Sequence, residues 1–443
     1  MDIATGSLLS LVYRVAGIAS LAALTIITAR ALPVDELGIY TSAIVAIGAI
    51  GTVAASFSGS AGYFVSKRGR EAAEVASSVT LLGLALSAIL AAAAVAVAVV
   101  GGGDTATAAI VAGLAIPPII VRTSLGGVYV GINALLRYAF SIHGYGIFAL
   151  IGTVLWVVVL DHRTAIDGLG VWIVAQYLSL AAVAATSPGW WRWLATHRPD
   201  PALAWQLVAF GAFTGLAGFI SYFNYRVDQL LVIGLDSQAG AGLYAQAVRV
   251  AEGLWLFSTA IAVASYAAVG ANTRAEASRI TSQGVRHTLL IVTVLAAPIA
   301  VVAPWLLGLL FGDEFREAGT ALRLLCLATL IYAPQSILSN FYTVQLGKPW
   351  ISLALAGGSL AVSVVTSLLI IPRVGFVGGA WATLISYGVT AVISTWLFLR
   401  LSDARWRDLF VIRKSDLASY PRLVRNLTRR LGFGDPATTG QQA

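Results

Sequence analysis

Seven ionisable side chains interrupt long apolar segments of this sequence, and their chemistry sets the first question about its function. Five are arginines and two are acids: Arg14, Arg122, Arg226, Arg249, Arg323, Asp228 and Glu252. In the middle of a membrane-spanning helix, each such charge costs about 2.5–3.5 kcal/mol on insertion scales. We therefore expect the seven side chains to face one another or a water-filled cavity.

Asp228, Arg249 and Glu252 flank a short hinge at residues 236–240, which joins two apolar segments. At a helical rise of about 1.5 Å per residue, Asp228 lies about 10 Å and Arg249 about 13 Å from the hinge, so the two can meet. Glu252 follows Arg249 at i,i+3 spacing on nearly the same face. Two interpretations stay open. The group is either a salt-bridge cluster that joins two helices, or a cluster for ion coupling or gating in which Asp228 or Glu252 takes up a proton.

The five arginines predict a cationic cavity if they line one space. Guanidinium groups hold phosphate and pyrophosphate through charge-assisted hydrogen bonds, so such a cavity suits an anionic head group. For a single arginine, snorkelling to the membrane surface is an equally good interpretation.

The elements that carry these charges follow from composition. Of the 443 residues, 58% are hydrophobic and 11% are charged, and the mean hydropathy is +0.85. Ordinary soluble domains are about 25% charged, so the solvent of this chain is a bilayer. We predict an all-α polytopic membrane protein with about twelve spans, at 8–32, 37–65, 75–100, 106–132, 138–160, 168–187, 203–235, 240–268, 286–310, 318–345, 349–371 and 376–400.

Positive charge predicts the orientation. With the amino terminus in the cytoplasm, 19 lysines and arginines fall in cytoplasmic loops and the tail, and four fall in outward loops. This bias favours a multi-pass protein of the cytoplasmic membrane with both termini inside. The net charge of the chain, +8, is therefore interpreted as a result of this topology and not as a sign of nucleic-acid binding. The acids in the outward loops are assigned no site. The first apolar segment is interpreted as an uncleaved signal anchor.

An internal repeat predicts two lobes. GIYTSA at 38–43 is echoed by GLYAQA at 242–247, an offset of 204 (242 minus 38), and GVW at 170–172 by GAW at 379–381, an offset of 209 (379 minus 170). Six spans per repeat place both in the same orientation, so we predict parallel lobes around a central cavity. The predicted divisions are an N-terminal lobe at 1–187, a cytoplasmic linker at 188–202, a C-terminal lobe at 203–400 and a basic cytoplasmic tail at 401–443.

Sequence patterns for catalysis and cofactors are missing. No GxxxxGK[ST] loop indicates nucleotide binding, the single cysteine forms no CxxC pair, and the four histidines lack metal-ligand spacing. We predict no cofactor, no metal and no enzymatic activity.

Short segments in a consistent order give the chain a family resemblance. They are ARAL at 29–32, LGIY at 37–40, Asp228 with GLYAQA at 242–247, FGDEF at 311–315, ALRLL at 321–325, LGKP at 346–349 and IPRVGFVGGA at 371–380. Together they resemble the Wzx-like flippases of lipid-linked oligosaccharides, in the multidrug/oligosaccharidyl-lipid/polysaccharide exporter superfamily. The resemblance implies two six-helix lobes around a central cavity, alternating access and ion or potential coupling. It also implies an undecaprenyl-pyrophosphate-linked oligosaccharide as the substrate, flipped from the inner to the outer leaflet.

Other functions remain open. A drug or metabolite antiporter of the same superfamily is the first alternative, although a carrier of cations should have an acidic cavity. A membrane glycosyltransferase or polymerase is the second, although the outward loops are short. Expected partners are the lipid-linked oligosaccharide, membrane lipids and a polysaccharide polymerase or export machinery. The sugar, the coupling ion and the oligomeric state are not predicted.

Overall fold

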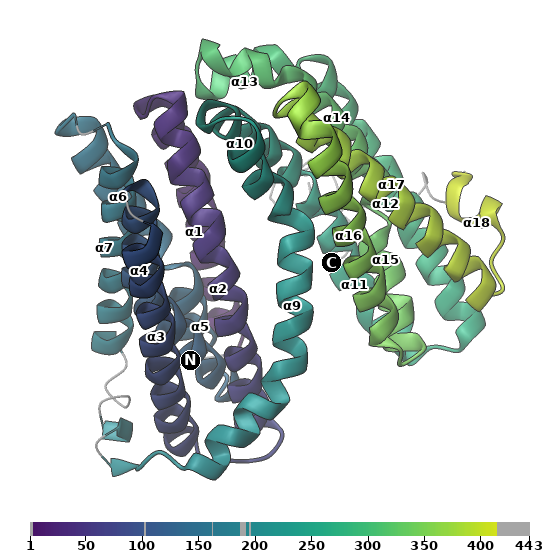
Figure 1. The fold of residues 1–443 in the computed structure, drawn as a ribbon. Helices are drawn as coiled ribbons and strands as arrows, with labels where there is room; N and C mark the ends of the chain where they lie inside the picture. Colours follow the sequence, from purple (N-terminus) through teal and green to yellow (C-terminus); the bar gives the residue numbers. More distant parts are fainter. Residues whose placement is uncertain (1–2, 102, 162, 187–191, 195, 414–443) are drawn as a thin grey trace, which may run out of the picture. The chain divides into compact units, whose positions relative to one another are not determined.

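A computed structural model describes residues 3–101, 103–161, 163–186, 192–194 and 196–413, and all the regular elements within these ranges are helices (Figure 1). The long helices are α1 (Ile3–Ala31), α2 (Val34–Ser66), α3 (Ala72–Gly101), α4 (Gly103–Gly131), α7 (Ala165–Thr186), α9 (Pro201–Leu235), α10 (Gln238–Gly253), α11 (Trp255–Ala271), α12 (Arg274–Val301), α14 (Gly319–Tyr332), α16 (Pro349–Val374) and α17 (Val377–Leu401). The short ones are α5 (Leu135–His143), α6 (Tyr145–Thr153), η1 (Val154–Val159), α13 (Ala303–Phe311), η2 (Asp313–Ala318), α15 (Gln335–Asn340), η3 (Phe341–Gln345) and α18 (Trp406–Phe410).

The predicted all-α membrane architecture is confirmed. Among the described residues, nine helices are long and apolar enough to span a membrane, and two bent helix pairs raise this number to 11. Helix α1 covers the remaining predicted span at 8–32.

Three predicted spans differ in detail from the helices. The span at 203–235 is bent by 40° between residues 212 and 215. The span at 138–160 is broken after α5, and α6 continues at an angle of 41°. The helix of the span predicted at 286–310 begins earlier, since α12 starts at Arg274. The ion pair between Arg279 and Glu276, at i,i+3 spacing, favours helix in this polar segment before the apolar one.

By contact density, the described chain divides into two compact units. Of the described residues, the first unit contains those within 3–250, 302–325 and 356–386, and the second contains those within 251–301, 326–355 and 387–413. The lobe boundaries predicted above, at 187 and 203, stay a prediction.

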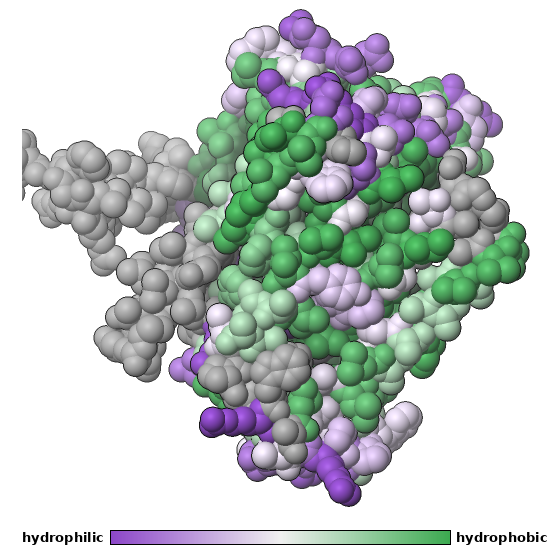
Figure 2. Space-filling model, turned by 90° about the vertical axis from the view of Figure 1, so that its left-hand side faces the viewer, coloured by the Kyte–Doolittle hydropathy of each residue, from purple (hydrophilic) through white to green (hydrophobic). Residues whose placement is uncertain are grey.

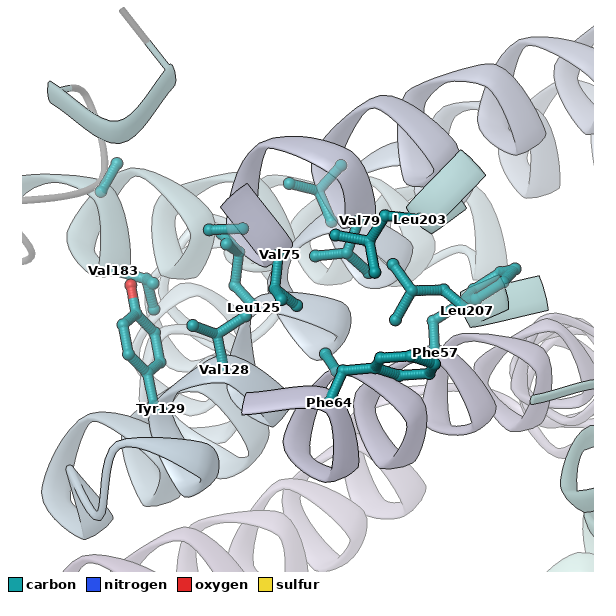
Figure 3. Packing of buried hydrophobic residues seen from close by; sticks show 14 residues of the cluster. Phe57, Phe64, Val75, Val79, Leu125, Val128, Tyr129, Val183, Leu203 and Leu207 are labelled. Carbon is teal, nitrogen blue, oxygen red and sulfur yellow. The ribbon is translucent and has the colours of Figure 1, made fainter. Parts of the chain in front are cut away.

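The first unit is built around a core shared by five helices. Phe57 and Phe64 of α2 pack with side chains of α3, α4, α7 and α9, including Val79, Leu125 and Leu207 (Figure 3). All five side chains are at most 8% exposed. This core fixes the helix faces that carry the polar residues described below.

Hydrophobic side chains also cover the outside of the first unit. On the face shown in Figure 2, hydrophobic residues occupy the middle and hydrophilic residues gather toward the two ends. Ile89 and Val95 of α3 are 66% and 58% exposed. Such a surface fits hydrocarbon rather than water.

The second unit has its own core. Phe341, Tyr342 and Phe398 are fully buried and pack with Leu409 of α18. The buried Leu409 attaches the short α18 segment to the body of this unit.

Candidate functional site

Asp228 is the centre of a buried polar site in the first unit. It lies on α9, is 5% exposed, and accepts hydrogen bonds from Tyr244 Oη on α10 at 2.5 Å and Thr383 Oγ1 on α17 at 2.8 Å. The backbone N–H of Gln229 donates to its other oxygen at 2.9 Å. Three donors from three helices can hold the carboxylate charged, and its remaining lone pairs can accept a proton or a small cation.

This carboxylate belongs to one repeat only. Tyr40 and Tyr244 occupy matching positions, 204 residues apart (244 minus 40), and are both buried. Each packs against a glycine of the last helix of its own half, Gly168 for Tyr40 and Gly379 for Tyr244. The position 204 residues before Asp228 is Leu24. The repeats therefore share the tyrosine packing, and only the second adds the acid.

Arg249 is directed toward the first repeat. Its Nη1 donates to Thr25 Oγ1 of α1 at 2.7 Å, and its charge acts on the hydroxyl groups of Tyr40 and Tyr145. Five residues separate Arg249 from Tyr244, which at about 100° per residue turns Arg249 by about 140° from the face that meets Asp228. Asp228 and Arg249 thus occupy different surroundings, although both lie near the hinge.

Arg122 occupies the break in the fifth span. It is 3% exposed, donates to the carbonyl oxygens of Ser141 and Ile142 near the end of α5, and also donates to Gln176 Oε1 at 3.0 Å. Its guanidinium carbon lies 5.2 Å from the ring centroid of Tyr145. The end of α5 leaves carbonyl groups without helical donors, and a buried cation there also complements the helix dipole.

The structure brings some predicted residues together. Arg122 and Arg249 both act on Tyr145, and Arg226 lies two residues before Asp228 on α9 and acts on its charge. The others are more separate. Glu252 is half-buried on α10 and belongs to the second unit, and Arg323 is exposed on α14. Arg14 lies in α1, and its side chain is outside the described residues.

Sequence reasoning missed the neutral donors and two acids with clear partners. Glu36 Oε2 accepts a hydrogen bond from the backbone N–H of Ala165 at the start of α7, at 2.5 Å. Asp236 Oδ2 accepts one from the backbone N–H of Phe376 just before α17, at 3.1 Å. Each acid caps the last helix of its own repeat. Glu36 and Asp236 occupy nearly matching positions in the two repeats, each beside an interhelical turn, and this correspondence in the sequence could have indicated the caps.

No group of three or more His, Cys, Asp or Glu side chains that could hold a metal ion occurs among the residues that the structure describes.

Comparison with known proteins places this architecture in a family. The model of the family described as polysaccharide biosynthesis protein matches residues 27–320, more than half of the chain. A relative from Haloferax volcanii, named probable low-salt glycan biosynthesis flippase Agl15, is 23% identical over 206 residues. The aligned part covers 44% of this chain and 42% of that relative, so the match spans less than half of either.

Two solved structures have the same fold. The lipid II flippase MurJ in an inward closed conformation gives a TM-score of 0.72 at 13% identity, over 96% of this chain and 99% of MurJ. An inward-facing multidrug resistance MATE family transporter of the MOP superfamily gives 0.70 at 14% identity, over 88% of this chain and 98% of the transporter. The chain therefore belongs to the polysaccharide biosynthesis protein family.

Proposed function

We propose that this protein flips an undecaprenyl-pyrophosphate-linked oligosaccharide from the cytoplasmic to the outer leaflet for surface polysaccharide export, by alternating access. The observation that carries the proposal is Arg249, a guanidinium on an apolar helix that donates a hydrogen bond to Thr25 of α1 and whose charge acts on the hydroxyl groups of Tyr40 and Tyr145. A pyrophosphate is the group that a cation in this setting recognises best, because the guanidinium can offer it several charge-assisted hydrogen bonds.

The proposed roles differ among the arginines. Arg249 contacts the pyrophosphate, and Arg14, Arg226 and Arg323 complete the cationic path for the head group. Arg122 acts as a positioning residue, because both of its terminal nitrogens already donate, to Ser141 and Ile142 and to Gln176. The polyprenyl tail stays in the bilayer while the sugar crosses.

Asp228 is proposed to couple the cycle to an ion or to gate it. Its three donors come from α9, α10 and α17, so a change in its charge alters the contacts of all three helices. Glu252, on the same helix as Arg249, is proposed to take part in this coupling.

The proposed setting is the cytoplasmic membrane, with both termini in the cytoplasm. The asymmetry of lysines and arginines between the loops supports this orientation. It places Arg30, Glu36 and Asp236 on the outer side. A polymerase or export protein that binds the tail at 401–443 would then act from the cytoplasm.

An antiporter for drugs or metabolites is the second candidate, and the buried carboxylate of Asp228 is the feature that favours it. A buried carboxylate suits an organic cation, whereas the surroundings of Arg249 suit an anion.

Deletion of the gene separates the two candidates. The flippase proposal expects lipid-linked repeat units to accumulate on the cytoplasmic side and surface glycan to be lost, both restored by the wild-type gene. Normal surface glycan together with altered resistance to small cationic compounds would overturn it in favour of the antiporter.

A further inference from the structure

The first turns of α2 and α10 meet at a pair of glycines. A Cβ atom added to Gly38 would lie 1.8 Å from the carbonyl oxygen of Gln238, and one added to Gly242 would lie 2.3 Å from the carbonyl oxygen of Val34. Each added Cβ would also lie 3.1 Å from the backbone nitrogen of the other glycine. The two backbones are therefore in direct contact, and no other residue type fits at either position without separating the helices.

The contact follows the internal repeat. Gly242 minus Gly38 and Gln238 minus Val34 both give 204, the offset of the sequence echo. Val34 thus contacts Gly242 as Gln238 contacts Gly38. Such a reciprocal contact lies on the pseudo-two-fold axis that relates the two repeats.

Each first turn is also anchored within its own repeat. Glu36, between Val34 and Gly38, caps α7, the sixth span. Asp236, beside Gln238, caps the start of α17, the twelfth span. The caps tie each turn to the last helix of its repeat, so a relative movement of the repeats is concentrated at the glycine pair.

A cavity of about 890 Å³ opens next to the contact. Val34 and Ala239, which flank the glycines, line it together with Arg30, Asp35 and Glu314. The glycine pair therefore lies between a polar space at the helix ends and the apolar helix interiors, where Tyr40 and Arg249 lie.

We propose that the Gly38–Gly242 contact is the outer gate of the transport path, closed here by backbone against backbone. The glycines contribute no side chains that interlock, so the helices can part and close again with little rearrangement, while the weak Cα–H···O contacts still favour closure. This proposal rests on the alternating access and orientation proposed above.

The test uses alanine at either glycine. Gly38→Ala and Gly242→Ala keep the helices apart and prevent closure, whereas Gly51→Ala on α2 and Gly253→Ala on α10 are matched controls, because an added Cβ there meets nothing within 4 Å. All four changes raise helix propensity in the same direction, so a difference between the pairs reports the contact and not the propensity.

The readout is accessibility from outside. Ser42, one turn after Gly38 on the same helix face, is changed to cysteine in a Cys326→Ala background, and intact cells are treated with a membrane-impermeant maleimide. We expect severalfold faster labelling of Ser42→Cys in both gate variants and the parental rate in both controls. Parental labelling in the gate variants would overturn the proposal, whatever their export activity.

A second measurement keeps both glycines, in case an alanine variant does not fold. In the Cys326→Ala background, Val34→Cys and Gln238→Cys are joined through two reducible disulfides by a short bis-methanethiosulfonate reagent, and export of surface glycan is followed. We expect export to stop on cross-linking and to return on reduction. Undiminished export by the cross-linked protein would refute the gate.

The labelling experiment needs no knowledge of the substrate. Faster labelling of the gate variants, combined with normal surface glycan in the deletion strain, would support the gate proposal and refute the flippase proposal. Lipid-linked glycan that accumulates in the deletion strain, combined with parental labelling of the gate variants, would support the flippase and refute the gate.

Discussion

At the scale of single residues, Asp228 illustrates how neutral groups hold a buried charge. Tyr244, Thr383 and the backbone of Gln229 supply its donors from three helices. Hydrogen bonds to a charged group contribute about 1.5–3 kcal/mol each, so the site joins the helices as well as accepting an ion.

Removing these donors tests that description. Tyr244→Phe and Thr383→Val should each lower the free energy of unfolding by about 1–3 kcal/mol in the parental protein. In an Asp228→Asn background the same changes should cost clearly less, because the charge that they serve is gone. Thermal melting of the purified protein in detergent, analysed as a double-mutant cycle, measures the difference. If the changes in the free energy of unfolding were strictly additive, Tyr244 and Thr383 would not be stabilising the carboxylate of Asp228.

The charged residues could be recognised from sequence because charges are rare in apolar segments. Their partners could not, because Tyr244, Thr383 and Thr25 are neutral and resemble many other polar residues in these helices. The direction of Arg249 also needed the structure, since its distance from the hinge allowed it to meet Asp228, whereas it donates to Thr25 of α1.

At the scale of elements, the break between α5 and α6 depends on a residue from another helix. Arg122 of α4 donates to the carbonyl groups that the end of α5 exposes and is held by Gln176 of α7. The sequence predicted one continuous span at 138–160, because the hydropathy of a span does not change where the helix bends. Arg122 thus joins three helices of the first unit.

Arg122→Lys should therefore destabilise the first unit although the charge is kept. An ammonium group cannot reach acceptors on α5 and α7 with the planar geometry of a guanidinium, so buried carbonyl groups lose donors. We expect a loss of about 2–4 kcal/mol, measured as a lower melting temperature or faster proteolysis between α4 and α7. Arg323→Lys, at an exposed position, is the control and should melt as the parent does. A parental melting temperature for Arg122→Lys would contradict the assigned role.

The two interhelical acids make a second prediction at this scale. Glu36→Gln and Asp236→Asn weaken the caps of α7 and α17, and each should cost about 0.5–2 kcal/mol. Asp35→Asn is the matched control, because Asp35 is exposed in the same turn as Glu36. Hydrogen exchange at the first turns of α7 and α17 should rise only in the corresponding cap variant. Equal exchange in Glu36→Gln and Asp35→Asn would argue against the cap.

At the scale of the whole molecule, two properties were predictable without a structure. Composition predicted the membrane, and the family match over residues 27–320 agrees with the resemblance read from short segments such as GLYAQA at 242–247. The repeat also anticipated a physical contact, since the glycines of the two echoed segments meet each other. The close backbone contact itself could not be predicted from the offset between the repeats. Many other glycines in these helices have no atom near the position that a Cβ would occupy, so a glycine alone does not indicate a contact.

Arg249, a cation on an apolar helix, is proposed to bind the pyrophosphate while the linked sugar crosses the bilayer. The most direct measurement is flipping of a fluorescent polyprenyl-pyrophosphate saccharide in proteoliposomes, with the wild-type protein, Arg249→Gln and Arg249→Lys compared at equal reconstitution. We expect flipping by the wild type, a loss of about tenfold or more for Arg249→Gln, corresponding to about 1.4 kcal/mol of lost interaction, and partial retention for Arg249→Lys. Wild-type rates for Arg249→Gln, or no flipping by the wild type, would contradict it.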